Sequence, residues 1–182
     1  MTTTAAKYET AHRPLMAVLD QIGADDWDHP SPCAGWSARD VVLHMVQTQR
    51  DFLTGRGCDL GLTPSVPADP AAAWRDHAGR VLAVVAHDAV ASAPFDGHFG
   101  PTTVGATLEQ FYVWDMVVHR WDVARATGLD AGFSAVELDQ VEQGADSFGA
   151  ALYMEGVCAP GVTPPDNADR QTDLLARLGR RA

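Results

Sequence analysis

Apolar residues recur along most of this 182-residue chain at the three- and four-residue spacing of an amphipathic helix. Five segments carry the pattern, and each has a start or stop signal at one end or both. No alternating run of five or more residues predicts a strand. We therefore expect an all-α protein, with helices over residues 5–22, 37–55, 69–89, 104–127 and 134–152 and a short helical turn at 174–178.

Capping residues define where three of these helices begin. Ser37 and Asp40 form a variant of the capping box, in which a side chain and a backbone amide satisfy each other across three residues. Ser134 and Glu137 form the same motif at the start of the last long helix. Asp69 precedes a proline at the first helical position, where the missing N–H has no cost.

The order of these segments predicts a four-helix bundle with a supplementary helix and an irregular, proline-rich C-terminal tail. A chain of 182 residues with 46% hydrophobic content can bury one core and is short for two, so we expect a single domain over residues 1–182. Residues 93–103 are expected to form a loop. Bundles of this kind build metal sites in their core from side chains on facing helices.

Charge and cysteine content exclude several classes of function. The net charge is −11, and Lys7 is the single lysine among thirteen basic residues, so nucleic acid and anionic membranes are unlikely partners. The chain has three cysteines without the CxxC spacing of a zinc knuckle: Cys33, Cys58 and Cys158. A secreted disulfide-bonded scaffold and a structural zinc knuckle are therefore disfavoured. We expect neither a signal peptide nor a membrane span, since no basic and apolar N-terminal segment and no run of about 20 apolar residues occurs in the sequence. We expect a cytoplasmic protein with a small-molecule substrate, and a homodimer is compatible with the sequence.

Three residues in two of the expected helices form a candidate metal site. His44 lies in the second helix, and Asp115 and His119 lie four residues apart in the fourth, about 5 to 6 Å apart at Cβ. Two imidazoles and one carboxylate can hold a catalytic divalent metal with a position left open. The alternatives are a hydrogen-bonded core histidine at His44, and an ion pair between Asp115 and Arg39 or Arg120.

Other polar residues have less specific interpretations. Asp122 follows His119 by one turn and is expected to accept a hydrogen bond from a ligand imidazole or to form a buried salt bridge. Trp36 and Trp121 are expected to pack near the site. Cys33 is expected to fill a small apolar space, with a metal ligand or a reactive thiol as the alternatives, and His98 is a candidate for the pocket mouth. The remaining histidines are expected at the surface: His12, His29, His77 and His87.

Two segments carry a resemblance to a known family. The first is Pro32-Cys33-Ala34-Gly35-Trp36-Ser37 followed by His44, and the second is Asp115-x-x-x-His119-Arg120-Trp121-Asp122. The chain resembles the DinB-like superfamily of metal-binding four-helix bundles, in the branch that includes the metal-binding domain of mycothiol-dependent maleylpyruvate isomerase. Residues 174–180 resemble the ending of single-domain members of that branch.

This resemblance implies a ligand set and a chemistry. The family's metal ligands map onto His44, Asp115 and His119, with Asp115 standing where the isomerase has a glutamate. Zinc is the usual ion, with nickel or iron as alternatives, and mycothiol or a similar thiol is the implied co-substrate. A thiol-dependent transferase or isomerase is then expected, while a metal-dependent hydrolase and a non-catalytic metal- or ligand-binding module remain open.

Overall fold

The computed structural model describes residues 2–130, 132–154 and 156–181. The expected all-α fold is confirmed: within these ranges the only sheet is one two-stranded hairpin. The helices are α1 (Thr3–Leu19), α2 (Ala38–Thr54), α3 (Pro70–Val85), α4 (Asp88–Ala91), α5 (Val104–Thr107), a π-helix (Leu108–Val113), α6 (Trp114–Ala126), α7 (Ala135–Phe148), a 3-10 turn (Gly149–Tyr153) and α8 (Arg170–Arg177).

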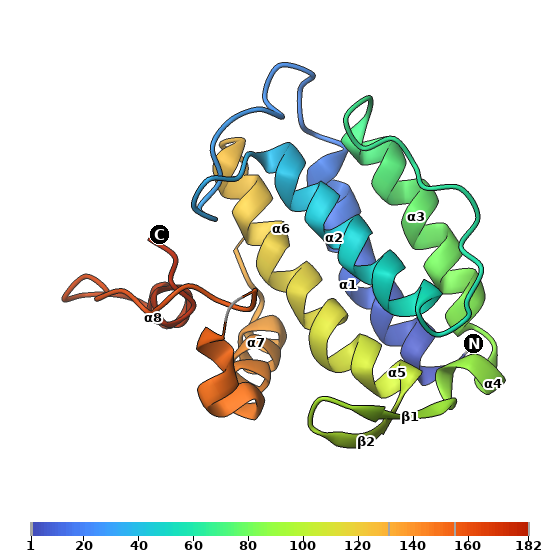
Figure 1. Ribbon diagram of the computed structural model, residues 1–182. Coiled ribbons are helices and arrows are strands. Elements are labelled where there is room, and N and C mark those ends of the chain that lie inside the picture. Colours follow the sequence, from blue (N-terminus) through green and yellow to red (C-terminus); the bar gives the residue numbers. More distant parts are fainter. Residues whose placement is uncertain (1, 131, 155, 182) are drawn as a thin grey trace.

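The four long helices α1, α2, α3 and α6 form the bundle (Figure 1). Helix α1 packs against α3 and α6, and α2 packs against the same two helices from the other side. Their inward stripes meet in a core that removes apolar surface from water, which is the main stabilising contribution to folding. The large side chains buried most completely in this core include Tyr8, Leu15, Met45, Trp74 and Met116.

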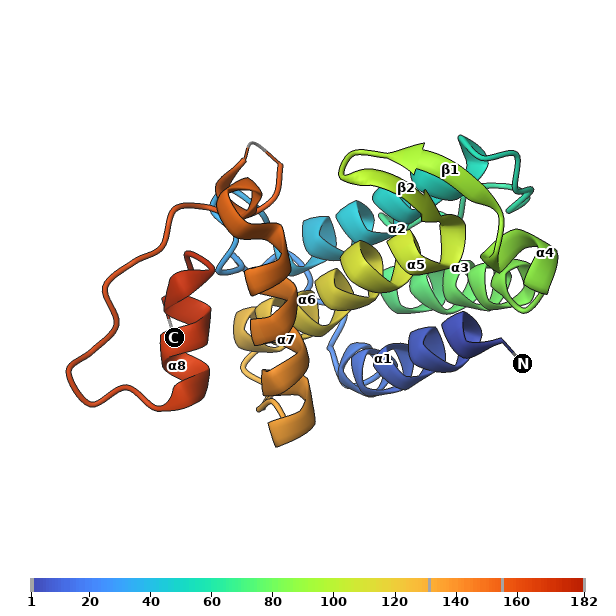
Figure 2. The same cartoon turned by 90° about the horizontal axis from the view of Figure 1, so that it is seen from below.

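Two further helices lie outside the bundle at one end of the molecule. Helix α7 crosses α6, and α8 packs against α7 on the side away from α3 (Figure 2). The crossing is close because Gly144 of α7 lacks a Cβ that would collide with the indole of Trp114. The Trp114 indole N–H also donates to the backbone oxygen of Val141 at 3.0 Å. No helix of the described ranges is both long and apolar enough to cross a membrane.

The capping predictions are confirmed in detail. The Ser37 hydroxyl accepts from the Asp40 amide, and the Asp40 carboxylate accepts from the Ser37 amide. Ser134 and Glu137 make the same reciprocal pair at the start of α7. The Asp69 carboxylate accepts from the third amide of α3 at 2.9 Å. These signals are local, so the sequence was sufficient to locate them.

Several helix ends differ from the prediction. Helix α1 ends at Leu19 rather than residue 22, and α3 ends at Val85, with α4 as a separate short turn. The last helix runs over Arg170–Arg177 rather than 174–178, because the Asp169 carboxylate caps it by accepting from the Thr172 amide at 2.8 Å. Apolar periodicity defines the buried stripe of a helix better than it defines its ends.

The expected loop at 93–103 is wrong. Strands β1 (Pro94–Gly97) and β2 (Gly100–Thr103) form an antiparallel hairpin with His98 and Phe99 at its turn. Four residues per strand are too few for an alternating pattern to be recognised. Gly100 at the turn has a φ of +107°, a conformation that favours glycine.

The expected helix 104–127 is continuous but not uniform. Its middle, Leu108–Val113, is a π-helix that directly precedes the segment carrying Asp115 and His119. Single π-turns inside α-helices occur often at functional sites. Here the π-helix widens the helix beside the candidate site.

His77 was expected at the surface and is fully buried. The Tyr8 hydroxyl donates to the Gln49 side-chain oxygen at 2.7 Å, and Nε2 of His77 lies 3.1 Å from the same oxygen. This chain of contacts joins α1, α2 and α3. Burial, helped by the positive charge of Arg50, lowers the pKa of His77 to about 3.

Candidate functional site

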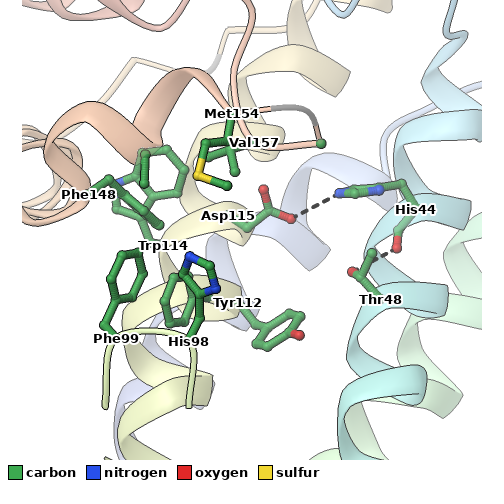
Figure 3. Close-up of a pocket in the computed structure, with 13 residues that line it drawn as sticks. His44, Thr48, His98, Phe99, Tyr112, Trp114, Asp115, Phe148, Met154 and Val157 are labelled. Atoms are coloured by element: carbon green, nitrogen blue, oxygen red, sulfur yellow. Dashed lines mark hydrogen bonds and ion pairs between the residues drawn. The ribbon is translucent and has the colours of Figure 1, made fainter.

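The structure brings His44 of α2 together with Asp115 and His119 of α6. Asp115 lies between the two imidazoles: Oδ2 is 3.5 Å from Nε2 of His44, and Oδ1 is 3.2 Å from Nε2 of His119. Figure 3 shows the Asp115 carboxylate pointing across the gap to His44. One ligand-type atom from each of the three residues lies within 4.8 Å of the others.

The alternative partners for Asp115 are occupied elsewhere. Arg39 pairs with Asp28 at 2.9 Å, and Arg120 pairs with Glu137 at 2.5 Å. The arginine ion pair considered for Asp115 is therefore wrong. His44 is also no fully buried core histidine, since a quarter of its side chain is exposed.

Asp122 holds the His119 ring in place. Its Oδ2 lies 2.9 Å from Nδ1 of His119, so the Nδ1 proton is donated to the carboxylate and Nε2 faces Asp115 and His44. Asp122 is completely buried and also accepts two hydrogen bonds from Arg180, from Nε at 3.1 Å and from Nη2 at 2.7 Å. Both expected roles of Asp122 are therefore present at once: it accepts a hydrogen bond from the imidazole of His119 and forms a buried salt bridge with Arg180.

Cys33 lies in this polar cluster, contrary to the expected apolar role. Its Sγ is 3.3 Å from Oδ2 of Asp122 and 3.6 Å from Nη2 of Arg180. Cys33, His119 and Asp122 form a second group with ligand atoms within 4.8 Å of one another. The Arg180 guanidinium already supplies the positive charge there and would repel a cation. The better candidate for a metal is therefore the group with His44.

The charges of the site are strongly coupled. Burial opposes ionisation of Asp115, but the imidazoles of His119 and His44 outweigh it and hold the pKa of Asp115 well below its usual range. Burial likewise opposes ionisation of Asp122, yet His119 and Arg180 lower its pKa to about 2. Burial disfavours the charged His119 ring, but Asp115 and Asp122 raise its pKa well above the ordinary value. Both carboxylates are thus ionised at neutral pH.

The loop before α2 positions Trp36 against the site. An isolated bridge between Pro30 and Ser37 closes this loop, and the Ser31 amide donates to the Trp36 oxygen at 2.7 Å. The Trp36 ring then lies with its centroid 4.8 Å from that of His44 and 6.3 Å from that of His119. Trp36 packs beside the site as expected.

A pocket of about 370 Å³ opens beside His44 and Asp115. Its walls come from the π-helix and the start of α6, from α7 and the segment after it, and from the turn of the hairpin (Figure 3). His98 lies at this pocket, as the sequence suggested. The aromatic residues that line the pocket are Phe99, Phe111, Tyr112, Trp114 and Phe148.

Sequence reasoning missed Arg180 and the aromatic wall. A buried carboxylate such as Asp122 needs a cation nearby, so the sequence indicated that an arginine could pair with it. The sequence did not indicate which arginine. Arg180 is 58 residues away along the chain. The aromatic residues come from distant segments, so no local pattern shows that they share one pocket.

Comparison with known proteins supports the relationship suggested by the motifs. Residues 8–56, which cover most of α1 and all of α2 with His44, match the family model described as the mycothiol maleylpyruvate isomerase N-terminal domain. The expected resemblance is confirmed. The match shows similarity to this domain over residues 8–56, which is less than half of the chain.

Curated relatives of this chain have no assigned function. One uncharacterized protein of Mycobacterium tuberculosis is 29% identical over 126 residues, which are 66% of this chain and 65% of that protein. Another from the same organism is 28% identical over 137 residues, which are 63% of this chain and 52% of that protein. The chain thus spans less than two thirds of the length of these relatives. No solved structure matches the chain significantly.

Proposed function

We propose that this protein is a divalent-metal-dependent enzyme in which His44, Asp115 and His119 hold the metal, with zinc as the ion. We further propose that it transfers or isomerises a small molecule with the help of a mycothiol-type thiol, as a single domain in the cytoplasm. The observation that carries the proposal is the convergence of two imidazoles and one carboxylate, of which His44 and Asp115 line an open pocket. Three protein ligands leave a coordination position free, whereas a structural zinc site is normally closed by four.

The donor atoms fit a zinc ion. Ligand atoms about 2.1 Å from a tetrahedral zinc are about 3.4 Å from each other. Oδ2 of Asp115 is 3.5 Å from Nε2 of His44, and Oδ1 is 3.2 Å from Nε2 of His119; each pair is close to this spacing, and the two pairs use different oxygens of one carboxylate. Ionised Asp115 supplies the negative charge that a dication needs, and Nε2 of His119 is free to act as a ligand because Nδ1 is held by Asp122.

The residues around the ligands have distinct tasks in this proposal. A bound zinc ion would supply a site where a thiol, or alternatively a water molecule, loses its proton near neutral pH. Asp122 fixes the orientation of His119, and Arg180 fixes Asp122. Trp36 limits movement of the His44 ring. The aromatic pocket then binds the second substrate beside the ligands and excludes water from it.

Cobalt(II)-loaded protein tests the proposal, because cobalt reports its ligands by absorption. Titration with mycothiol is expected to produce a sulfur-to-cobalt charge-transfer band, and S-methylated mycothiol is expected to produce none. Calorimetry in two buffers of different ionisation enthalpy is expected to show release of a proton on thiol binding. The His44→Ala variant is expected to lose the response, and His87→Ala, which alters an exposed histidine, is expected to keep it.

Other outcomes of this experiment would replace the proposed function with a different one. Absence of a thiol response together with turnover of an ester or lactone panel would replace thiol transfer by hydrolysis. Binding of metal without response to either panel would favour a non-catalytic binding module. Failure to retain cobalt in the unmodified protein would remove the metal site itself.

A further inference from the structure

The pocket beside His44 and Asp115 has a largely apolar wall. It is about 370 Å³, which equals the liquid volume of about a dozen water molecules. Five aromatic side chains line it, together with Met154 and Val157. Its polar groups are His44, Thr48 and Asp115 at one side and the imidazole of His98 beside Phe99, while the rest of the wall is mainly apolar or aromatic (Figure 3).

The described lining of the pocket contains no lysine or arginine. The nearest well-placed cations are engaged: Arg180 pairs with Asp122, and Arg56 lies over the rings of Phe52 and Phe95 at 4.0 Å from each centroid. A carboxylate or phosphate group on the part of a ligand that lies away from His44 and Asp115 would meet no lysine or arginine of this lining, and burial of an unpaired anion is strongly unfavourable. The aromatic part of the pocket therefore disfavours an anionic group.

Exposed apolar side chains gather at the pocket. Among the described residues six large hydrophobic side chains are exposed, and three of them, Phe99, Met154 and Val157, line this pocket. Phe99 at the hairpin turn is 56% exposed, and its ring lies parallel to that of Phe111, at an interplanar angle of 7° and a centroid distance of 6.1 Å. Exposed apolar groups that cluster at a concave site are typical of ligand-binding surfaces.

We propose that the pocket selects a substrate that has an uncharged aryl or similarly bulky apolar body and whose reactive polar end faces His44 and Asp115. The body fills the aromatic part of the pocket and is covered on its outer side by Phe99. This inference rests on the proposed function in placing the reactive end at the metal. The selection for a neutral, apolar body rests on the pocket alone.

Matched hydroxamates test this selectivity in zinc-loaded protein, because their shared head group binds zinc and only the body differs. By calorimetry, benzohydroxamate is expected to bind at least tenfold more tightly than acetohydroxamate, which lacks the ring. It is also expected to bind at least tenfold more tightly than 4-carboxybenzohydroxamate, which adds an anion. Equal or tighter binding of the acetyl or the carboxylated ligand would overturn the proposal.

Two surface variants locate the ring in the pocket. Phe99→Ser is expected to weaken benzohydroxamate binding threefold or more and to leave acetohydroxamate unchanged. Leu62→Ser is the matched control, since Leu62 is 86% exposed and does not line the pocket; it is expected to change neither affinity. Equal affinities of the Phe99 variant and the unmodified protein for benzohydroxamate would contradict the assigned position of the ring.

A metal-independent probe separates this proposal from the proposed function. The neutral dye N-phenyl-1-naphthylamine, which brightens in apolar sites, is expected to bind chelator-treated protein, and to bind it more weakly after Phe99→Ser. If the protein retained no zinc, all three hydroxamates would fail to bind while the dye still bound, and only the proposed function would be lost. If zinc were retained but the dye did not bind, the apolar substrate class would be wrong.

Discussion

Asp122 contacts both His119 and Arg180, and its contact with His119 depends on its pairing with Arg180. Its carboxylate is completely buried, and its ionised state is maintained by His119 on one side and by Arg180 on the other. A buried ion pair adds little stability over an apolar replacement, but removal of one partner leaves an uncompensated charge. In the proposed metal site Arg180 is therefore a positioning residue: it acts on His119 through Asp122.

Replacement of Arg180 tests this arrangement. Arg180→Met is expected to lower the free energy of unfolding by about 3 to 5 kcal/mol, since buried Asp122 then lacks its cation. Zinc affinity is expected to fall about 10- to 100-fold, as for other groups that orient a ligand histidine. Arg180→Lys is expected to restore part of both, and Arg181→Met, at an exposed neighbour, is expected to stay within about 0.5 kcal/mol in urea unfolding. A normal zinc affinity in the Arg180→Met variant would show that Arg180 is only structural.

At the scale of the helices, the sequence predicted the features that depend only on residues close together in the chain. The capping boxes at Ser37 and Ser134 are local, and so is the spacing that puts Asp115 and His119 on one side of α6. The π-helix, the short hairpin and the burial of His77 depend on contacts between segments. His77 shows the difference clearly, because its place on α3 becomes a core position only when Gln49 of α2 lies opposite it. The spacing within α3 places His77 on the same side as Trp74 and Val81, but it does not show that Gln49 supplies a polar partner there.

The buried His77 predicts a specific acid sensitivity. Its pKa is lowered to about 3 by burial first and by the charge of Arg50 on α2 next; on α3, Arg80 lowers the pKa further and Asp76 partly opposes it. The unfolded chain takes up a proton near pH 6.5 and the folded chain does not, so stability is complete above pH 6.5 and is lost as the pH falls towards 3.

Replacement of His77 removes this contribution. Between pH 6 and 4 the unmodified protein is expected to lose about 1.4 kcal/mol of unfolding free energy per pH unit more than His77→Leu. Urea unfolding at several pH values measures the slope, and His87→Leu, at an exposed position, serves as the control. Equal slopes in the unmodified protein and the His77 variant would mean that His77 is protonated in the folded state.

At the scale of the whole molecule, the candidate site joins parts that are far apart in the sequence. His44 comes from α2, Asp115 and His119 come from α6, and Arg180 follows α8, which lies outside the bundle. A metal bound to the three ligands would connect α2 and α6 across the bundle. Because the unfolded chain keeps these residues apart, the metal would bind the folded state and stabilise it.

Metal removal should therefore lower the stability of the whole bundle. At a zinc concentration a thousandfold above the Kd, the expected stabilisation is about 4 kcal/mol, which corresponds to a rise in Tm of roughly 8 to 16 °C for a protein of this size. A chelator should reverse the rise. His44→Ala should abolish it without unfolding the protein, because His44 is partly exposed and the core depends on other residues of α2. The exposed-histidine variant His87→Ala should keep the full rise. Identical calorimetric melting curves with zinc and with chelator in the unmodified protein would contradict a metal link between α2 and α6.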